Sequence, residues 1–569
     1  MANDAAIPFS LAALLLLLAP CCLLFFRSFY PQNLPPGPRA SGFGWGNHRS
    51  LLSMPKLWVT LDDLGKAYPR GFYTLWFRWQ PTIVVTSPRV ATELLDKRSS
   101  KYSSRARSVV AGELMYGGQA IPFLPTNAKW RNQRRLYHNA LSEKRMPDYH
   151  PLQEMEAKRL VHDLSTWEAN GGVDWNKYLD RYVVSVLVAV AYGRRVDDVN
   201  VPYVQSAFKR MRELGEAAVG GKGKHLEAFP FLQSLPEFLT PYKRKWRAYR
   251  EEAATFWLGL AETVKTRMSE GRAPPSFTRD LYEEGLTEAN LDQEEFAILA
   301  GGFFAGGIET SSASMQWFIL AMVTHPRVQL KAQEELDRVV GRDRNPTWSD
   351  HDNLPYMRAL VQEVLRWRPV AILGGQPHAT SEEDVYEGYT IPIGSTILCD
   401  TWSLHRDPDY FTKPDEFRPE RYLSVANGGE GEGERYPQKT GHSAFGWGRR
   451  ICPGMHVAQN SLWIAFAHIL HHFTLSTPES LPAPDIFAQL EGFAPKPEPF
   501  PVQIVLRGGK AGRDFVEKEM EAAMEGLAKL PLRYILPFAD IVHEPFQIFQ
   551  VLVQVVHRRD LPISHSVVF

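Results

Sequence analysis

The longest helical pattern in the chain begins near Leu291 and runs to His325, where Pro326 prevents the helix from continuing. About 34 residues at 1.5 Å each form a rod of roughly 50 Å, and a rod of that length crosses the middle of a large fold. Other helical patterns fill most of the chain between about residues 127 and 340. These features predict a large, helix-rich domain built around one central helix.

Strand patterns are short and lie on both sides of this helical part. Aromatic and β-branched runs flank Gln80-Pro81, as in a hairpin, and similar patterns return at 385–400 and 500–507. The sequence therefore predicts a mainly α fold with small β-sheets, in a single large domain over residues 41–507.

Four glycines interrupt the central helix, at Gly301, Gly302, Gly306 and Gly307. Each costs up to about 1 kcal/mol relative to Ala in a helix interior, so a compensating contact is expected. Either a bulky planar group or a second helix could make it, and the sequence favours neither. Glu309 and Thr310 follow at once, and this acid beside an alcohol suits either a chemical role or a capping pair.

Charge and cysteine content exclude several classes of protein. Lys and Arg total 64, as do Asp and Glu, so the formal net charge is zero and no bulk attraction to nucleic acid is expected. The four cysteines show no CxxC pair and no Cys/His zinc spacing. A disulfide framework is therefore not expected, and the body of the protein should lie in a reducing compartment.

Cys452 has the most unusual surroundings of the four. It follows the glycine- and arginine-rich segment 445–451 and, with Pro453, is predicted to begin a helix, because Pro is tolerated at the first helical position. Unpaired N–H groups and the positive end of the helix dipole would then favour the thiolate. Such a cysteine suits a metal ligand. A nucleophile would need a histidine base that the sequence does not locate, and a buried inert cysteine is the plain alternative.

The N-terminus carries an apolar run at 5–26 that has one polar residue, no charge and enough length to cross a bilayer. A cleaved signal peptide is the alternative, but no basic region precedes the run and Arg27 follows it directly. We expect an N-terminal membrane anchor at 1–27 and a proline-rich hinge at 28–40, with Arg27 and Arg39 keeping the body cytosolic.

Several motifs occur in a fixed order and together resemble one family. The haem-loop pattern Phe-x-x-Gly-x-Arg-x-Cys-x-Gly is matched at Phe445, Gly448, Arg450, Cys452 and Gly454. Other marks are Trp130-x-x-x-Arg134, Gly306-Gly307-x-Glu309-Thr310, Glu363-x-x-Arg366 and Pro419-Glu420-Arg421-Tyr422. On these residues the chain resembles the cytochrome P-450 family of haem-thiolate monooxygenases, microsomal type, and is similar to its fungal biosynthetic members. The resemblance covers roughly residues 30–507 and leaves 508–569 as a C-terminal extension without an assigned role.

The resemblance implies haem b as the cofactor, with the Cys452 thiolate as axial ligand of the iron. The residues that would hold the haem are Trp130, Arg134, His378, Phe445, Arg450 and Cys452. Glu309 and Thr310 would be the catalytic pair that relays protons. A buried structural triad would consist of Glu363, Arg366 and Arg421. The substrate pocket would be lined by Phe303, Phe304, Gly306, Val370, Ile372 and Phe493.

A member of this family would insert one oxygen atom from O2 into a lipophilic small molecule, and fungal secondary metabolism is the expected setting. No flavin or nicotinamide fingerprint is present, so electrons would come from NADPH through a separate NADPH-cytochrome reductase. The basic residues expected to meet that reductase are Lys129, Arg131, Arg135 and Arg449. The expected location is the endoplasmic reticulum membrane, with a single-pass anchor and the catalytic domain on the cytosolic side.

Two other functions are alternatives. A haem-thiolate isomerase or dehydratase would share the cysteine loop but would not need the pair Glu309-Thr310, which is intact. A non-catalytic haem-binding protein would need neither an electron donor nor an anchor.

Overall fold

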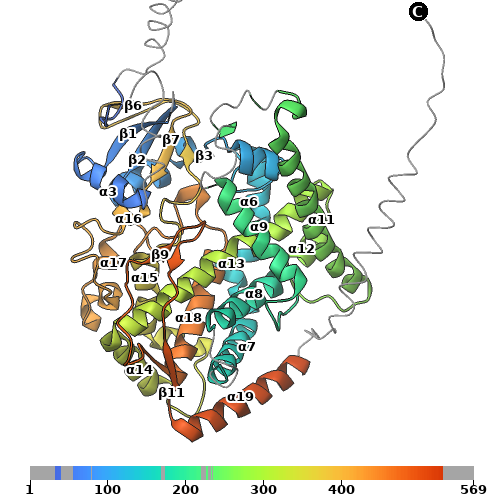
Figure 1. Ribbon diagram of the computed structural model, residues 1–569, viewed down its shortest axis with the longest axis vertical. Coiled ribbons are helices and arrows are strands. Elements are labelled where there is room, and N and C mark those ends of the chain that lie inside the picture. The colour runs from blue at the N-terminus through green and yellow to red at the C-terminus, as the bar shows by residue number, and fades with distance from the viewer. Residues whose placement is uncertain are drawn as a thin grey trace, which may run out of the picture.

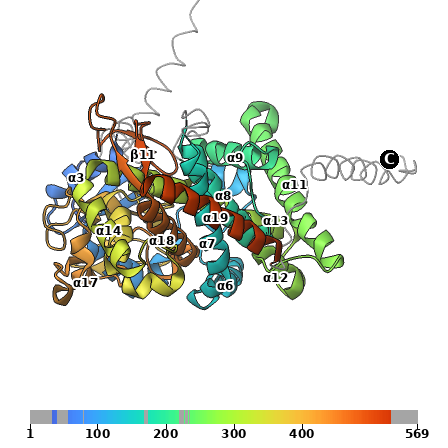
Figure 2. The ribbon, with the colours of Figure 1, turned by 90° about the horizontal axis from the view of Figure 1, so that it is seen from below.

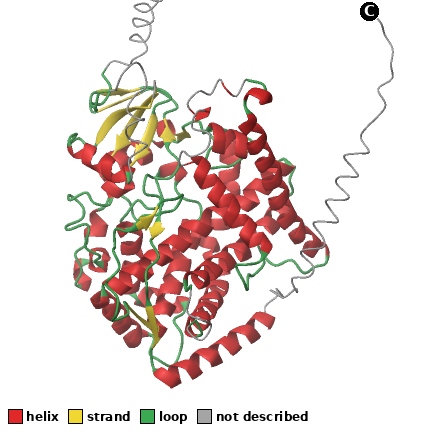
Figure 3. Cartoon of the chain, in the orientation of Figure 1, coloured by secondary structure: helices red, strands yellow, loops and turns green. Residues whose placement is uncertain are grey.

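The structure is a computed structural model that describes residues 33–39, 56–77, 80–167, 174–218, 226–227, 232 and 235–529. Helices make up most of it, and strands gather mainly at one corner (Figures 1 and 3). The longer helices are α3 (Leu57–Lys66), α6 (Ala128–Leu141), α7 (Met146–Ser165), α8 (Asn176–Tyr192), α9 (Pro202–Ala218), α11 (Pro241–Ser269), α12 (Phe277–Glu284), α13 (Gln293–Thr324), α14 (Pro326–Val339), α15 (Pro355–Trp367), α18 (Met455–His472) and α19 (Gly509–Lys529). The mainly α class is therefore confirmed.

Helix α13 is the predicted central rod, and it crosses the middle of the molecule (Figure 1). The side chain of Asp292 caps its first turn, and it ends at Thr324, one residue before His325 and two before Pro326. Two of its glycines lie where other helices pass closely. A Cβ at Gly301 would lie 2.2 Å from Cδ2 of Trp257 on α11, and one at Gly307 would lie 2.6 Å from Cδ2 of Leu187 on α8. Close helix packing thus explains half of the glycines.

The largest sheet has five strands in the order β1-β2-β7-β4-β3. Strands β1 (Phe72–Phe77) and β2 (Gln80–Val85) form the predicted antiparallel hairpin, and β7 (Thr396–Cys399) pairs with β2 in parallel. The last two strands, β3 (Ser104–Arg105) and β4 (His378–Ala379), have only two residues each and place Arg105 directly opposite His378.

Three two-stranded sheets complete the β structure within the described residues: β5–β6, β8–β11 and β9–β10. Their strands are β5 (Asp384–Tyr386), β6 (Tyr389–Ile391), β8 (Phe473–Ser476), β9 (Gln489–Leu490), β10 (Lys496–Pro497) and β11 (Gln503–Leu506). The strands expected within 385–400 and 500–507 are therefore present.

The expected membrane anchor at 1–27 lies outside the described residues, as does part of the expected hinge at 28–40. The described part of the hinge, 33–39, packs along β1, where the Thr74 N–H donates to the Pro36 carbonyl oxygen at 3.0 Å and the Thr74 hydroxyl to that of Pro35 at 2.7 Å. Within the described part of the chain, no helix has the length and apolarity that a membrane crossing requires.

The first part of the C-terminal extension forms α19, which lies across α7 (Figure 2). Its Glu519 carboxylate pairs with Lys158 of α7 at 2.9 Å and accepts a hydrogen bond from Asn345 at 2.7 Å. Val516 is buried beneath the helix, and the Phe515 ring stacks on His472 of α18. The extension therefore begins as a helix packed on the domain.

Candidate active site

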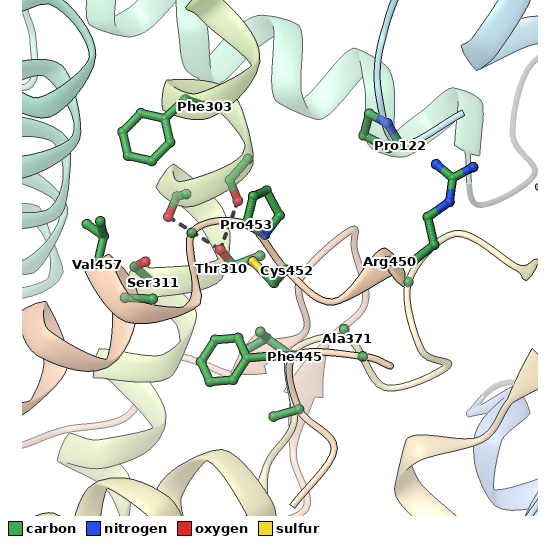
Figure 4. Close-up of a pocket in the computed structure, with 18 of the residues that line it drawn as sticks. Pro122, Phe303, Thr310, Ser311, Ala371, Phe445, Arg450, Cys452, Pro453 and Val457 are labelled. Atoms are coloured by element: carbon green, nitrogen blue, oxygen red, sulfur yellow. Dashed lines mark hydrogen bonds between the residues drawn. The ribbon is translucent and has the colours of Figure 1, made fainter. Parts of the chain in front are cut away.

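A cavity of about 340 Å³ lies between α13, the N-terminal end of α18 and the loop that carries Cys452. In the view of Figure 4, Thr310 and Cys452 lie at its centre and Arg450 lies to one side. Most of its lining is apolar, with contributions from α8, α13 and the residues Val370, Ala371, Gly374 and Gly375. The sequence-predicted residues that line it are Trp130, Arg134, Phe303, Gly306, Thr310, Val370, His378, Phe445, Arg450 and Cys452.

The loop before Cys452 is a tight turn that returns the chain to Phe445, whose carbonyl oxygen accepts from the Cys452 N–H at 2.8 Å. Gly446 and Gly448 have positive φ angles of 79° and 50°. A Cβ at Gly448 would lie 2.1 Å from the carbonyl oxygen of Leu95, so only glycine fits there. Helix α18 begins at Met455, so the prediction that Cys452 opens the helix is wrong by three residues. The turn back to Phe445 delays the helix.

Burial raises the pKa of the Cys452 thiol in the protein alone, and the nearby Gly454 N–H and Arg134 only partly oppose this effect. The expected lowering of this pKa by a helix terminus is therefore wrong. Its side chain is nevertheless accessible from the cavity. A metal would displace the thiol proton outright, since coordination favours the thiolate. Among the described residues no histidine hydrogen-bonds to Cys452, which leaves the nucleophile alternative without a base.

Three arginines with no carboxylate partner among the described residues face one side of the cavity: Arg105, Arg134 and Arg450. They donate to backbone carbonyl oxygens instead, Arg105 to Gln376 at 2.5 Å, Arg134 to Ile451 at 2.6 Å and Arg450 to Ser103 at 2.7 Å. The Arg105 Nε is buried without a hydrogen-bond partner. Burying cations without an anion is unfavourable, so this side of the cavity suits a ligand with carboxylate groups.

The pKa values agree with an unpaired cation cluster. Burial and the neighbouring arginines lower the pKa of Arg450 to about 8, and burial lowers that of Arg105 to about 10. Burial, Arg105 and Arg450 together hold the pKa of His378 well below its usual range, so His378 is neutral. Its Nδ1–H donates to the Tyr102 carbonyl oxygen at 2.8 Å. An anionic group in the cavity would raise the pKa values of these arginines again, because an opposite charge nearby favours the charged form.

The indole of Trp130 supports this cluster, because the Arg450 guanidinium lies 4.2 Å from the centre of its ring. The Asn127 side chain caps α6 by accepting a hydrogen bond from the backbone N–H of Trp130 at 2.8 Å. Trp130 and Arg134 are four residues apart, so they share one face of α6. The sequence did not indicate Arg105, because the pairing of β3 with β4 brings this residue to the cavity. Strands of two residues are too short to show an alternating apolar pattern.

The α13 side of the cavity is formed by backbone and by Thr310. Gly302 and Gly306 line it, and among the described residues no heavy atom lies within 4 Å of a Cβ placed at Gly306. The Thr310 hydroxyl donates to the Gly306 carbonyl oxygen at 2.9 Å (Figure 4). Glu309 does not line the cavity, because it lies on a different face of the helix. The second explanation of the glycines, room for a planar group, thus applies to Gly306, whereas a Cβ at Gly302 would lie 3.0 Å from the Tyr137 hydroxyl oxygen on α6.

Three of the expected pocket residues do not line the cavity. Phe304 is fully buried between helices, where its ring meets Trp257 edge-on. Ile372 packs in a separate small cluster with Trp58 and Trp402. Phe493 is 39% exposed, away from the cavity. Their assignment to the pocket is therefore wrong for this conformation.

Glu363, Arg366 and Arg421 meet with no solvent exposure. Arg366 donates to both oxygens of Glu363, at 2.7 and 2.8 Å, and Arg421 Nε lies 3.4 Å from Glu363 Oε1. Glu432, which the sequence did not indicate, adds a second carboxylate at 2.6 Å from Arg421. The network thus contains two arginines and two carboxylates.

His405 links this network to the cysteine loop. Its Nδ1–H donates to the Arg366 carbonyl oxygen at 2.9 Å, and its Nε2 accepts from the Ser443 N–H at 2.9 Å. Ser443 lies two residues before Phe445 and lines the cavity. The buried ion pairs therefore support the segment that presents Cys452.

The cavity has the parts that a haem requires. The Cys452 sulfur and the glycine face of α13 both border it, and arginines without a carboxylate partner among the described residues would hold the two carboxylates of the haem. The orphaned Arg105 Nε and the open space at Gly306 are the observations that test this fit.

Comparisons with known proteins agree with this geometry. The family model described as cytochrome P-450 matches residues 35–504. A cytochrome P-450 monooxygenase of Armillaria gallica is 36% identical over 497 residues, covering 86% of this chain and 93% of the relative. One from Clonostachys rogersoniana is 32% identical, covering 89% of this chain and 92% of the relative. A zebra fish cytochrome P-450 solved with progesterone shares the fold, with a TM-score of 0.66 and 23% identity over 80% of this chain and all of the other. Because the family model covers residues 35–504 and the relatives match over most of their length, the chain belongs to the cytochrome P-450 family.

Proposed function

We propose that this protein is a haem-thiolate monooxygenase that inserts one oxygen atom from O2 into a lipophilic small molecule. The observation that carries the proposal is the position of Cys452, whose thiol faces the cavity that Gly306 and Thr310 border from α13. Haem b, when bound, supplies the oxygen-activating chemistry, and electron donation from the cysteine thiolate favours O–O cleavage.

The protein's own residues hold and orient that group. Arg105, Arg134 and Arg450 would pair with its carboxylates, since all three line a side of the cavity that has no carboxylate among the described residues. The Trp130 ring holds Arg450 in place, and His378 contributes a neutral imidazole at the same edge. Phe445 fixes the backbone of the cysteine loop through its carbonyl oxygen.

Thr310 and Glu309 supply protons to the reaction. The Thr310 hydroxyl lies at the cavity wall, where it could donate a hydrogen bond into the cavity in place of the one it gives to the Gly306 carbonyl oxygen. Glu309 lies one residue earlier, and burial raises the pKa of its carboxyl, which favours a form that carries a proton.

The substrate is lipophilic because the lining offers mostly apolar groups. The side chains that support this assignment are Ile121, Val186, Leu187, Phe303, Val370 and Ala371. Fungal secondary metabolism is the setting we propose, since the relatives compared above are fungal monooxygenases.

Electrons come from NADPH through a separate reductase that docks on the basic side of α6 and the cysteine loop. Arg131 and Arg449 are exposed there, and Arg135 is exposed although it pairs with Glu284 at 2.8 Å. Lys129 is a weaker candidate than the sequence suggested, because it turns inward to Glu295 at 3.2 Å. Charge steering of this kind weakens as salt rises.

The membrane setting is also part of the proposal. Residues 1–27 anchor the protein in the endoplasmic reticulum membrane, and the catalytic domain lies on the cytosolic side, because the apolar run at 5–26 is followed by Arg27. The segment 33–39 then fixes the entry of the chain against β1.

Substitution of the two described cysteines tests the central claim. Cys452→Ala should abolish the red-shifted Soret band of the reduced, CO-bound protein, whereas Cys399→Ala should keep it, since Cys399 is buried in β7 and does not line the cavity. A thiolate spectrum that persists in Cys452→Ala would overturn the proposal. NADPH consumption in the presence of a reductase then separates a monooxygenase from an isomerase or dehydratase.

A further inference from the structure

Two neighbouring backbone N–H groups of the cysteine loop donate to imidazole nitrogens. The Ser443 N–H donates to Nε2 of His405 at 2.9 Å, and the Ala444 N–H donates to Nδ1 of His442 at 3.2 Å. Both imidazoles are buried. The two residues that precede Phe445 are therefore held by histidine side chains.

The hydrogen bonds of His442 fix the position of its proton. A backbone N–H can only donate, so Nδ1, which accepts from Ala444, carries no hydrogen. Burial and the nearby Arg366 lower the pKa of His442 to about 3, so the ring is neutral and its hydrogen lies on Nε2. That N–H donates to Oε1 of Gln362 on α15 at 2.6 Å. Gln362 thus favours the tautomer that can accept from Ala444.

Both imidazoles are held by the same helix. His405 donates through Nδ1–H to the Arg366 carbonyl oxygen, and His442 donates to Gln362, four residues earlier in α15. The Arg366 guanidinium in turn donates to both oxygens of Glu363. Helix α15 therefore positions the cysteine loop at two points, of which His405 is one and His442 the other.

The segment held in this way leads directly to the carbonyl group that fixes the cysteine backbone. Ala444 and Phe445 line the cavity, and the Phe445 carbonyl oxygen accepts from the Cys452 N–H at 2.8 Å. Only the backbone angles of Ala444 and Phe445 separate this hydrogen bond from the one to His442. A change at the imidazole would therefore turn the carbonyl group that holds Cys452.

We propose that His442 is a positioning residue for the Cys452 ligand. As the acceptor of the Ala444 N–H, it sets the direction of the Phe445 carbonyl oxygen, which holds the Cys452 N–H. The inference rests on the proposed monooxygenase function, in which the Cys452 thiolate is the axial ligand of the haem iron. A side chain that only filled the space between α15 and the loop would need a ring but no nitrogen.

Two substitutions separate the acceptor from the ring. His442→Phe keeps a planar ring but offers no acceptor to the Ala444 N–H. His442→Asn loses the ring but keeps an oxygen, and asparagine side chains accept from the backbone N–H two residues further along, which here belongs to Ala444. A space-filling role would favour phenylalanine, whereas the proposed role favours asparagine.

The test follows the red-shifted Soret band of the reduced, CO-bound, full-length protein during incubation at a fixed temperature, since this band reports thiolate ligation. His442→Phe should shorten the half-life of the band about tenfold, because it leaves a buried N–H without an acceptor. His442→Asn should keep the half-life within about twofold of that of the unmodified protein. Gln362→Leu should shorten it about threefold, and Gln362→Glu, which keeps an acceptor for the Nε2–H, should not.

Tyr422→Phe is the matched control. The Tyr422 hydroxyl donates to the Gly441 carbonyl oxygen at 3.1 Å, one residue before His442, so the substitution removes a hydrogen bond from the same loop and leaves both imidazole contacts in place. The half-life of the band in this variant should stay within about twofold of that of the unmodified protein.

The outcomes distinguish this inference from the function on which it rests. A half-life in His442→Asn equal to or shorter than that in His442→Phe would overturn the role of His442 alone, as would an unchanged half-life in Gln362→Leu. If His442→Phe does not fold, the comparison of Gln362→Leu with Gln362→Glu decides, and equal half-lives in these two would overturn the inference. If the unmodified protein shows no red-shifted band, the proposed haem-thiolate function is overturned instead.

Discussion

Thr310 and Cys452 reach the cavity from different elements, so each can be changed without moving the other. Thr310→Ala removes a hydroxyl at the cavity wall and leaves the cysteine loop intact. We expect the variant to keep its reduced-CO spectrum and substrate binding but to consume NADPH and release peroxide in place of product. Removing one positioned proton donor costs about 10²–10⁴-fold in the affected step.

The matched control is Ser314→Ala, which also removes a hydroxyl from α13 at the cavity wall. It should retain the product yield of the unmodified protein, measured as product formed per NADPH oxidised. An unchanged yield in Thr310→Ala would show that the Gly306–Thr310 segment serves only packing.

The ionisation of Asp400 should make the free energy of unfolding depend on pH. It is fully buried, it accepts from the Ser403 hydroxyl at 2.7 Å, and burial raises the pKa of its carboxyl from 3.8 to about 8. Between pH about 4 and about 8 the folded state keeps the proton that the unfolded state has lost. Its contribution therefore makes the free energy of unfolding fall as pH rises through this window.

Asp400→Asn removes that titration and should be more stable than the unmodified protein at neutral pH. The advantage should grow from pH about 4 to about 8 and then stay constant. Urea unfolding of both proteins at a series of pH values measures it. A difference that does not depend on pH would contradict the expectation.

At the scale of elements, the buried ion pairs around Glu363 support the cysteine loop through His405. Glu363→Gln would leave Arg366 facing a neutral amide without solvent, a change that costs about 3–5 kcal/mol. We expect a large loss of folded haem protein, seen as a lower urea midpoint and a weaker reduced-CO signal.

Glu420→Gln is the control for that substitution, because Glu420 lies in the adjacent turn but pairs with Lys331, which is 56% exposed. Glu420 is 22% exposed, and glutamine keeps an oxygen that can accept from the Tyr356 hydroxyl. The variant thus loses only a partly exposed ion pair, which contributes at most about 1 kcal/mol, and it should stay close to the unmodified protein. Equal destabilisation by the two changes would argue against a special role for the buried network.

Elements long enough to repeat their apolar pattern several times could be predicted from the sequence, and elements of two residues could not. Helix α13 was predictable because its apolar pattern persists until Pro326, and the cysteine loop because its glycines have no substitute. Strands β3 and β4 contain two residues each, and their pairing joins residues far apart in the chain. For the same reason the sequence missed Arg105. The sequence also predicted the start of α18 too early. The hydrogen bond from the Cys452 N–H to the Phe445 carbonyl oxygen, which delays the helix, leaves no mark in the pattern of apolar residues.

At the scale of the whole molecule, α19 packs the described part of the C-terminal extension against α7 and α18. Val516 is buried beneath it, and the pair of Lys158 with Glu519 is about one-quarter exposed. Removal of residues 508–569 should leave a folded haem protein whose Tm is lower by a few degrees, because burying one valine contributes about 1.5–3 kcal/mol.

The matched full-length variant is Val516→Ala, which should lower the Tm by a smaller amount in the same direction. Thermal unfolding followed by circular dichroism measures both effects. A truncated protein with an unchanged Tm would show that α19 adds nothing to the stability of the domain, and one that fails to fold would show that the domain depends on it.

The glycines of α13 also bear on how this enzyme could diverge. Gly301 and Gly307 are fixed by the helices that touch them, but a methyl group at Gly306 would meet no described atom. One nucleotide change converts glycine to alanine, and in a helix interior that exchange adds up to about 1 kcal/mol of stability. The same methyl group would occupy space that the cavity now offers to its ligands. A substitution that stabilises the helix would therefore reduce the space in the cavity, so a lineage that keeps Gly306 keeps that space and forgoes the added stability.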